Sequence, residues 1–344
     1  MTHPAARTIG WDLGGVHVKA ALIEDSCVRE VVQAPCRLWR GLPALDETLA
    51  RLPEWARAPA SHAVTMTGEL TDCFADRTDG VAQLSAWAER TLDGPVRIYA
   101  GRSGFVAPGA AAGSAADIAS ANWHATAALV GRHRETALVV DIGSTTADLI
   151  PVVAGMPVAR GYSDAERLET GELVYSGVVR TALVALSDHA PWRGRRTSLM
   201  AEFFATTADA HRLTGDLPEG ADQQHSADLK GKSIAESEIR LARVIGRDHA
   251  EGTASEWRAL AAWFAEAQLR RLHDAAATVL SRDDLPEDAP LVVCGAGAFV
   301  AERLAARLGR RAQPLTDLIS DRLAGEARIW ASTCGPALAV GLIA

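Results

Sequence analysis

The segment WDLGGVHVK (residues 11–19) returns in altered form as VDIGSTTAD (residues 140–148). In each, an apolar run ends at an aspartate, Asp12 or Asp141, and a glycine-containing turn leads into a second apolar run. This pattern is typical of two strands joined by a tight turn, with a carboxylate at the end of the first strand. The internal repeat predicts two α/β domains of related design that face one another.

Outside the two hairpins, apolar periodicity and turn residues predict further strands and helices. Strands are expected over residues 8–12, 16–24, 27–34, 63–67, 96–99, 136–141, 146–153 and 291–294. Helices are expected over residues 42–55, 81–92, 115–130, 299–308 and 335–344, with a loop over 101–113 and a helical insertion over 197–250. Gly131 is expected to cap a helix in the left-handed conformation. Ser233 and Thr253 begin capping-box patterns of helix starts, and the last helix is expected to pack onto the first domain.

Charge and cysteine content exclude several classes of protein. The 344 residues carry a net charge of −8 with no basic face, which argues against a nucleic-acid partner. The five cysteines are dispersed without a CxxC pair and indicate reduced thiols. No apolar run reaches the ~18 residues of a membrane span, and the first expected strand begins too early for a signal peptide. We therefore expect a cytoplasmic protein without a membrane partner, whose oligomeric state the sequence leaves open.

The first hairpin carries residue types that bind a phosphate group together with a metal ion. Gly14 and Gly15 allow backbone amides to approach a phosphate closely, because glycine has no Cβ. Asp12 can hold Mg²⁺ through water, and Lys19 offers a positive charge to phosphate oxygens. The alternative is an ordinary Gly-Gly hairpin with an incidental aspartate and lysine.

The second hairpin repeats this arrangement and adds hydroxyl groups. Asp141 stands where Asp12 stands in the first hairpin, and Gly143 occupies the turn. Ser144, Thr145 and Thr146 follow and supply hydroxyl donors beside the turn amides. Serine and threonine are also common in ordinary turns, so the second hairpin alone does not establish a phosphate site.

A third motif, CGAG (residues 294–297), lies between an expected strand and an expected helix. The start of that helix would offer amides and a positive dipole end to an anion, with Gly295 and Gly297 in the turn. Such turns are frequent, so one GxG turn is weak evidence, and the order of the motifs along the chain is more specific. Two Asp–Gly hairpins precede a strand–GxG–helix unit and a short terminal helix.

This order resembles the phosphate and adenosine signatures of the sugar-kinase, heat-shock-chaperone and actin superfamily over essentially the whole chain. The chain is most similar to the hydantoinase/oxoprolinase-like branch, and within it to tetrahydromethanopterin-linked one-carbon pathway proteins related to the methanofuran-biosynthesis condensing enzyme. The segments that carry this finer resemblance are TGELTDCF (67–74), ANW (121–123), DIGSTTADL (141–149), ETGELVYSG (169–177), EFFATTAD (202–209) and KGK (230–232).

The resemblance implies a two-lobed actin/sugar-kinase-like fold, in which duplicated ribonuclease-H-like domains enclose a central cleft. The N-terminal lobe is expected over residues 1–134 plus 331–344, and the C-terminal lobe over residues 135–330. The implied activity is a transferase that condenses aminomethylfuran diphosphate with the phenol of a tyramine- or tyrosine-type acceptor and releases diphosphate.

For that chemistry, Asp12 and Asp141 would hold Mg²⁺ against the charge that develops on the departing diphosphate. Lys19 and the residues of the two turns would bind its oxygens. Lys230 and Lys232 are expected to close over the diphosphate, although Lys-Gly-Lys is also typical of a solvated loop.

The acceptor phenol has an intrinsic pKa near ~10 and needs a proton acceptor during its attack. Glu69 is the candidate base and Asp72 the second choice, while Glu69 at a helix start is an equally good interpretation. Asn122 and Trp123 are expected to hold the furan or phenol ring, although a helical tryptophan more often belongs to a core.

Two departures from the nucleotide-using relatives weaken an ATP-dependent interpretation. Val16 stands where kinases usually carry serine or threonine, and Ala296 interrupts the usual glycine run. The alternatives are an ATP-dependent kinase or hydrolase, with adenosine bound at residues 295–297, and a non-enzymatic nucleotide-gated scaffold. The sequence shows neither a separate peptide-binding domain nor a filament insert to favour the scaffold.

Overall fold

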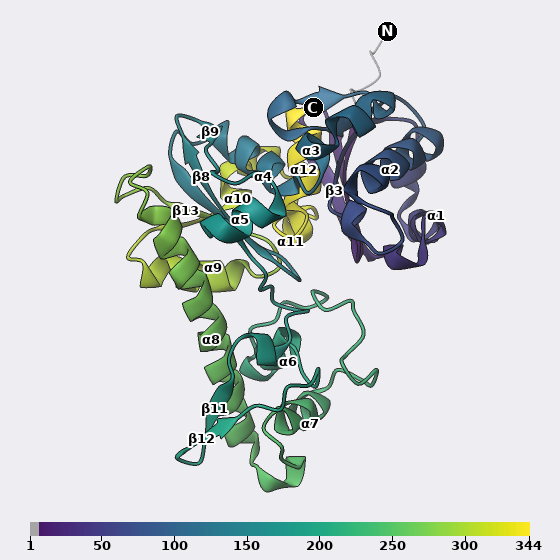
Figure 1. Ribbon diagram of the computed structural model, residues 1–344. Coiled ribbons are helices and arrows are strands. Elements are labelled where there is room, and N and C mark those ends of the chain that lie inside the picture. The colour runs from purple at the N-terminus through teal and green to yellow at the C-terminus, as the bar shows by residue number, and fades with distance from the viewer. Residues whose placement is uncertain (1–6) are drawn as a thin grey trace.

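The first lobe is built on a six-stranded sheet. The computed structural model describes residues 7–344 (Figure 1). The first six residues of the expected N-terminal lobe, on which the signal-peptide prediction also depends, lie outside the described residues. The strand order is β3-β2-β1-β4-β5-β6, with β1 (Arg7–Leu13), β2 (His17–Glu24), β3 (Cys27–Pro35), β4 (Ser61–Met66), β5 (Val96–Tyr99) and β6 (Phe105–Val106). The first three strands, which were expected from the sequence, pair as an antiparallel meander, and β4 runs parallel to β1.

The second lobe repeats this arrangement. Its sheet has the order β10-β8-β7-β13-β14, with β7 (Ala137–Ile142), β8 (Ala147–Val153), β10 (Leu173–Val174), β13 (Leu291–Cys294) and β14 (Ala312–Pro314), while β9 (Met156–Pro157) pairs with β8. The hairpin β7–β8 is antiparallel and β13 runs parallel to β7, as β4 does to β1. The repeated sequence therefore corresponds to a repeated structural unit.

The first sheet buries both of its faces, because successive side chains of a strand point to opposite sides. Ile9, Trp11 and Leu13 of β1 belong to a cluster shared with α1 (Pro43–Arg51) and α2 (Arg77–Thr91). On the opposite face, a Cβ on Gly10 would lie 2.0 Å from the carbonyl oxygen of Ala337 in α12 (Gly335–Ile343). The last helix thus packs directly on the first sheet, as predicted.

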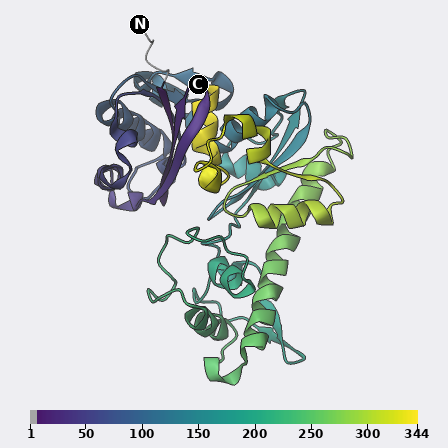
Figure 2. The ribbon, with the colours of Figure 1, turned by 180° about the vertical axis from the view of Figure 1, so that it is seen from behind.

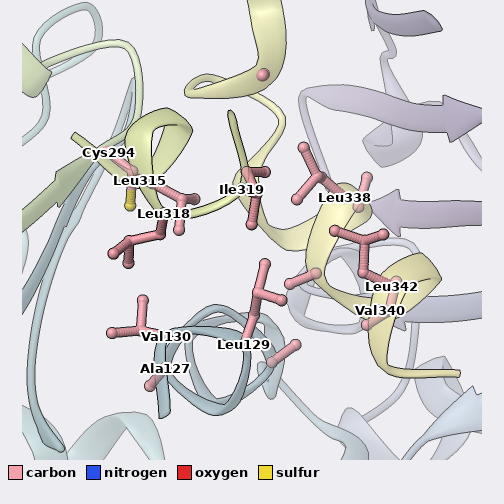
Figure 3. Close-up of a cluster of buried hydrophobic side chains, with 14 of the residues drawn as sticks. Ala127, Leu129, Val130, Cys294, Leu315, Leu318, Ile319, Leu338, Val340 and Leu342 are labelled. Atoms are coloured by element: carbon pink, nitrogen blue, oxygen red, sulfur yellow. The ribbon is translucent and has the colours of Figure 1, made fainter. Parts of the chain in front are cut away.

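Two helices lie between the sheets. Seen from behind, α12 stands between the first sheet and the second lobe (Figure 2), and α4 (Asn122–Gly131) packs against both α12 and β8. Figure 3 shows side chains of α4, of α12 and of the α10 (Leu315–Leu318) region gathered in one buried cluster. Because this core joins residues from both lobes, the lobes are held against each other at their base.

A helical insertion extends from the second lobe along α8 (Ala254–Leu280), as Figure 1 shows. Leu272 and Ala276, late in α8, belong to the core of the second sheet, whereas Trp257 and Phe264, earlier in α8, belong to the core of the insertion. The insertion also contains α6 (Thr207–Thr214), α7 (Ile234–Val244) and a hairpin of β11 (His189–Trp192) and β12 (Arg195–Ser198). It therefore begins earlier than predicted, with strands that the sequence analysis missed.

A loop of the insertion touches the first lobe. The Nε2 atom of Gln224 donates to the carbonyl oxygen of Val16 at 3.2 Å and lies 3.1 Å from Nε2 of His17. One residue further on, Nε2 of His225 lies 2.6 Å from Nη2 of Arg37. The insertion thereby reaches across to the hairpin that carries the first glycine turn.

Several predicted boundaries were wrong for identifiable reasons. The helix expected over 115–130 is broken into α3 (Ala115–Ile118) and α4, because Ser120 takes a left-handed φ of 53°. Gly131 ends α4 without a left-handed φ; a Cβ there would lie 2.1 Å from the carbonyl oxygen of Gly155, so it serves close packing. The helix expected over 42–55 ends at Arg51, and a 3₁₀ turn follows after Pro53.

Most other elements lie where they were expected. The expected loop over 101–113 contains 3₁₀ turns and the short strand β6. Capping boxes begin at Ser233 and Thr253, as predicted. The remaining helices are α5 (Asp164–Thr170), α9 (Ala298–Arg307) and α11 (Arg328–Ala331). Among residues 7–344, no helix combines the length and the apolar character that crossing a membrane requires.

Candidate active site

A cavity of about 530 Å³ lies between the two glycine-turn hairpins. Its lining includes most of the residues that the sequence analysis singled out: Asp12, Gly14, Gly15, Lys19, Asp72, Asn122, Asp141, Gly143, Ser144, Thr145 and Thr146. The two lobes therefore bring together motifs that stand far apart in the sequence. Such a cleft between domains is a common place for a small-molecule site.

The first hairpin places a carboxylate and an amine side by side in the wall of the cavity. Asp12 lies opposite Lys19 in the antiparallel register, and the Lys19 Nζ atom lies 3.3 Å from Asp12 Oδ2. Burial lowers the pKa of Lys19, but the nearby charges of Asp12 and Asp141 outweigh it and raise that pKa overall. The buried Oδ1 atom of Asp12 has no hydrogen-bond partner among the described residues. The hairpin thus holds a charged lysine and a carboxylate oxygen that is free to bind a cation.

The second hairpin has the same geometry but two carboxylates. Asp141 lies opposite Asp148 in the register, as Asp12 lies opposite Lys19. Burial, with the negative charge of Asp148 beside it, raises the pKa of Asp141 to about 7. Asp148 is held by Arg167, whose Nη1 donates to its Oδ1 at 2.5 Å. Arg167 was not predicted, and it neutralises one of the two facing carboxylates.

The two glycine turns are closed in the same way. The amide of Gly14 donates to the carbonyl of His17 at 2.9 Å, and the amide of Gly143 donates to that of Thr146 at 2.8 Å. These glycine amides are therefore used within the turns. The amides of Ser144 and Thr145, by contrast, donate to no acceptor among residues 7–344, which leaves them available to a ligand.

The segment after β10 supports the second turn. The amides of Val179 and Arg180 donate to the carbonyl of Ser144 at 3.1 and 2.9 Å. A Cβ on Gly177 would lie 2.4 Å from the Thr145 nitrogen, so only glycine fits there. Arg180, which lines the cavity, donates from Nη1 to Thr145 Oγ1 at 3.4 Å. The motif ETGELVYSG thus ends at a glycine that packs against the turn, and the residues just after the motif support the turn and bring a second cation to it.

Glu69 lies behind the cavity wall. Its side chain is 1% exposed, and its Oε1 accepts a hydrogen bond from Ser120 Oγ at 2.9 Å. Burial raises the pKa of Glu69 to about 7. Ser120 lines the cavity, whereas Glu69 does not. The predicted base therefore reaches the cavity only through a hydroxyl group, while Asp72 lines the cavity directly.

Trp123 does not lie where the sequence analysis placed it. It is 1% exposed, belongs to the core between the sheets and does not line the cavity. The guanidinium carbon of Arg167 lies 4.7 Å from its ring centroid. No face of the ring is free for a ligand, so a stacking role for Trp123 is excluded, and only its neighbour Asn122 reaches the cavity.

Lys230 and Lys232 do not close over the cavity either. Lys232 donates from Nζ to the carbonyl of Asp222 at 2.7 Å and lies 3.0 Å from Asp222 Oδ1. Lys230 is exposed. Neither lysine lines the cavity. The Lys-Gly-Lys segment is a surface loop fixed by neighbours within the insertion.

The CGAG turn is a packing feature. Gly295 has a φ of 86° and donates its amide to the carbonyl of Ser332 at 3.0 Å, and Gly297 donates to that of Ile142 at 2.8 Å. A Cβ on Gly295 would lie 2.2 Å from the Ile142 carbonyl oxygen. Neither glycine lines the cavity, and both amides are already paired. The predicted diphosphate contacts of Gly295 and Gly297 are therefore wrong.

The cavity also contains residues that the sequence analysis missed. Three large apolar side chains stand exposed in its wall: Trp39 (44%), Leu70 (47%) and Tyr175 (59%). Exposed apolar groups gathered at a cleft commonly mark a binding surface. Leu70 and Tyr175 lie within two of the segments that carry the family resemblance, which was the available signal, whereas Trp39 stands in a 3₁₀ turn without a motif.

The donor set suits a magnesium ion. Magnesium is usually held by one or two carboxylates together with phosphate oxygens and water, not by a protein-only cage. Asp12 and Asp141 both line the cavity, and Asp12 offers an unpaired oxygen. Across residues 7–344, no group of three or more His, Cys, Asp or Glu side chains is arranged to hold a metal. These residues therefore fit a metal ion that arrives with a phosphate ligand.

Two lobes with matched strand–Asp–Gly–strand hairpins around one cleft define a protein of the actin and sugar-kinase class. An acetone carboxylase in its nucleotide-free structure shares the fold, with a TM-score of 0.61 at 10% identity over 98% of this chain and 70% of that one. The hydantoinase/oxoprolinase family pattern matches residues 61–315. The chain belongs to the hydantoinase/oxoprolinase family.

Within that family, two relatives share a name. A protein of Methanocaldococcus jannaschii is 30% identical over 242 residues, which are 70% of this chain and 72% of the relative. A protein of Methanococcus vannielii is 34% identical over 119 residues, which are 35% of this chain and 53% of the relative. Both are named (4-{4-[2-(gamma-L-glutamylamino)ethyl]phenoxymethyl}furan-2-yl)methanamine synthase.

Proposed function

We propose that this protein joins aminomethylfuran diphosphate to the phenol of a tyramine-type acceptor, forming an aryl ether and releasing diphosphate. The name that the two relatives share describes a product in which an oxymethylene bridge links a phenyl ring to a furan ring. The observation that carries the proposal is the composition of the cavity. It combines the carboxylates and cations of a phosphate site with exposed apolar side chains suited to rings.

The diphosphate end of the substrate would lie between the two glycine turns. Lys19 and Arg180 offer positive charge from opposite lobes, and the amides of Ser144 and Thr145 offer hydrogen bonds. When bound, Mg²⁺ held by Asp12 and Asp141 would neutralise charge on the leaving group. Donors fixed in place before the reaction stabilise a developing negative charge without the cost of reorganisation. The furan ring delocalises the positive charge that develops on the carbon as the carbon–oxygen bond breaks.

The ring end would lie against the apolar part of the cavity wall. Trp39 and Leu70 come from the first lobe and Tyr175 from the second, so the rings would be held from both sides. Aromatic surfaces bind rings by offset stacking or edge contacts. Replacing Tyr175 with alanine is expected to raise the KM for the phenolic acceptor more than that for the diphosphate.

No observation favours the ATP-dependent kinase or hydrolase, or the nucleotide-gated scaffold. The kinase or hydrolase interpretation places adenosine at residues 295–297. Gly295 and Gly297 donate their amides within the fold and do not line the cavity. The substrate's own diphosphate would take the place between the hairpins that nucleotide phosphates take in ATP-using relatives.

The test is a coupled assay with Mg²⁺, aminomethylfuran diphosphate and either tyramine or its γ-glutamyl derivative. It follows diphosphate release and the mass of the ether, with ATP plus acceptor as the parallel reaction. Lys19→Met is expected to abolish turnover, whereas Lys230→Met, which removes a lysine outside the cavity, is the matched control and should leave it unchanged. Diphosphate release coupled to ether formation supports the proposal. ATP cleavage without ether formation would refute it.

A further inference from the structure

The break between α3 and α4 brings one hydroxyl group to the cavity wall. Ser120 sits at this break with a φ of 53°, which a non-glycine residue adopts only under constraint from its surroundings. Ser120 lines the cavity, and its Oγ donates to the buried Glu69 at 2.9 Å. The strained backbone therefore holds a hydroxyl between the cavity and a carboxylate that the cavity does not reach.

The surroundings of Glu69 isolate it from water. It lies in a 3₁₀ turn (Gly68–Leu70), and a Cβ on Gly80 of α2 would lie 2.5 Å from its carbonyl oxygen, so α2 covers it closely. Its Oε2 has no hydrogen-bond partner among the described residues. A buried carboxylate oxygen without a partner is costly to a fold, so Glu69 is not explained by stability alone.

Two other charged groups face this pair. Asp164 Oδ2 lies 3.4 Å from Ser120 Oγ and 3.0 Å from Nη2 of Arg77. Both charges act on Glu69: Asp164 raises its pKa and Arg77 lowers it, and both effects are smaller than that of burial, which brings it to about 7. Arg77 and Asp164 pair with each other and act on the pKa of Glu69 in opposite directions, so burial remains the main cause of its shift.

We propose, on the basis of the proposed function, that Ser120 and Glu69 form a proton relay for the phenolic acceptor. The phenol hydroxyl donates to Ser120 Oγ, and the serine proton passes to Oε1 of Glu69. The phenol oxygen forms its bond to the furfuryl carbon as the bond from that carbon to diphosphate breaks. The proton ends on Glu69 and the negative charge leaves with diphosphate, so atoms and charge balance. Ser120 touches the acceptor, and Glu69 acts through it.

A hydroxyl is suited to this place because it can accept and donate a hydrogen bond at once. A carboxylate exposed in the cavity would compete for the cations that bind diphosphate, and it would repel the leaving group. Placing Glu69 behind Ser120 keeps its charge out of the cavity while its basicity remains available.

The experiment compares two variants with two acceptors at saturating Mg²⁺. Glu69→Gln keeps an oxygen that can accept from Ser120 but has no useful basicity. Ser120→Gly removes the hydroxyl while relieving the left-handed strain, so it should fold well. Asp25→Gly, at an exposed turn residue with a φ of 51°, is the matched control for a change of stability alone. The acceptors are tyramine and a ring-fluorinated tyramine whose phenol is already ionised at the assay pH.

With tyramine, both variants are expected to lose about 10²-fold or more in kcat, the usual contribution of a positioned base. With the fluorinated acceptor, which needs no base, the loss should shrink to less than about tenfold. A variant that damaged the metal or diphosphate site would lose the same fraction of kcat with both acceptors. The ratio of the loss with tyramine to the loss with the fluorinated acceptor therefore reports the relay alone. Equal losses with both acceptors, or full activity of Ser120→Gly with tyramine, would overturn the inference. Wild-type protein that forms no ether at all would instead refute the proposed function.

Discussion

Replacing Glu69 with glutamine should change how the stability of the protein depends on pH. Burial raises the pKa of Glu69 from 4.5 to about 7, so between these values the folded state binds a proton that the unfolded state releases. The proton bound by Glu69 in the folded state therefore adds to the free energy of unfolding. This contribution is fully present below pH 4.5 and is lost as the pH rises through 7. Glutamine does not titrate and has no such loss.

The magnitude follows from the size of the shift. One pKa unit corresponds to about 1.4 kcal/mol. The free energy of unfolding of wild-type protein should therefore fall by about 3 kcal/mol relative to that of Glu69→Gln between pH 4.5 and about 7. With an unfolding entropy typical of a chain of this length, that corresponds to roughly 4 °C in Tm. An amide left without a partner in Glu69→Gln would lower its stability by the same amount at every pH. The informative quantity is therefore how the difference in Tm between the two proteins changes with pH.

The assay is thermal unfolding of both proteins at several pH values between 5 and 8.5, in EDTA to exclude bound metal. The Tm of Glu69→Gln should rise relative to wild type as the pH increases. A Tm difference that stays constant across this range would show that Glu69 titrates near its ordinary value. Burial would then not prepare Glu69 to accept a proton near neutral pH.

Three further predictions concern the metal site, the buried ion pair and the contact of α12 with the first sheet. Asp12→Asn and Asp141→Asn should lose turnover by roughly 100-fold or more and also the rise in Tm that Mg²⁺ with diphosphate gives wild-type protein; a full rise in both variants would refute the metal assignment. Arg167→Leu should lower the free energy of unfolding by roughly 3–5 kcal/mol because Asp148 is left buried and unpaired; urea unfolding measures this, and the double variant with Asp148→Leu should recover most of the loss. Gly10→Ala should cost roughly 2 kcal/mol or more because its Cβ would overlap the backbone of α12; an unchanged Tm would show that α12 can shift without cost.

The sequence predicted the site best where its geometry is local. Asp12 and Lys19 are fixed by one hairpin, and Asp141 by another, so a strand–turn–strand pattern is enough to place them. The repeat between the hairpins then implied that both face one cleft. Their placement needed no knowledge of distant packing.

The predictions that failed depend on contacts between distant segments. The amides of Gly295 and Gly297 are taken by Ser332 and Ile142, which no local pattern reveals. Lys232 forms an ion pair with Asp222 of the same loop region and therefore does not extend into the cavity. In each case the motif is present, but its amide or ammonium groups are already bonded to a residue that is distant in the sequence or in another part of the loop.

Trp123 was expected in the cavity and is buried in the core, whereas Ser120 lines the cavity and was not predicted. Trp123 is in a helix enclosed on several sides, so helical periodicity does not indicate which residue faces the cavity. Ser120 reaches the cavity only because the helix breaks there with a left-handed φ. A serine in an alanine-rich helical pattern gives no sign of such a break, because tertiary packing overrides helix propensity.

The contact between α12 and the first sheet determines the order in which the protein can fold during its synthesis. The strands of the first sheet are made at the start, but the helix that covers their inner face follows roughly 300 residues after β1. At the usual 5–20 residues per second, the ribosome needs about 15–60 s to make that stretch. During this time the apolar inner face of the sheet, which includes Ala21, Ile23 and Ala63, lacks its cover. The lobe that is synthesised first is therefore completed last.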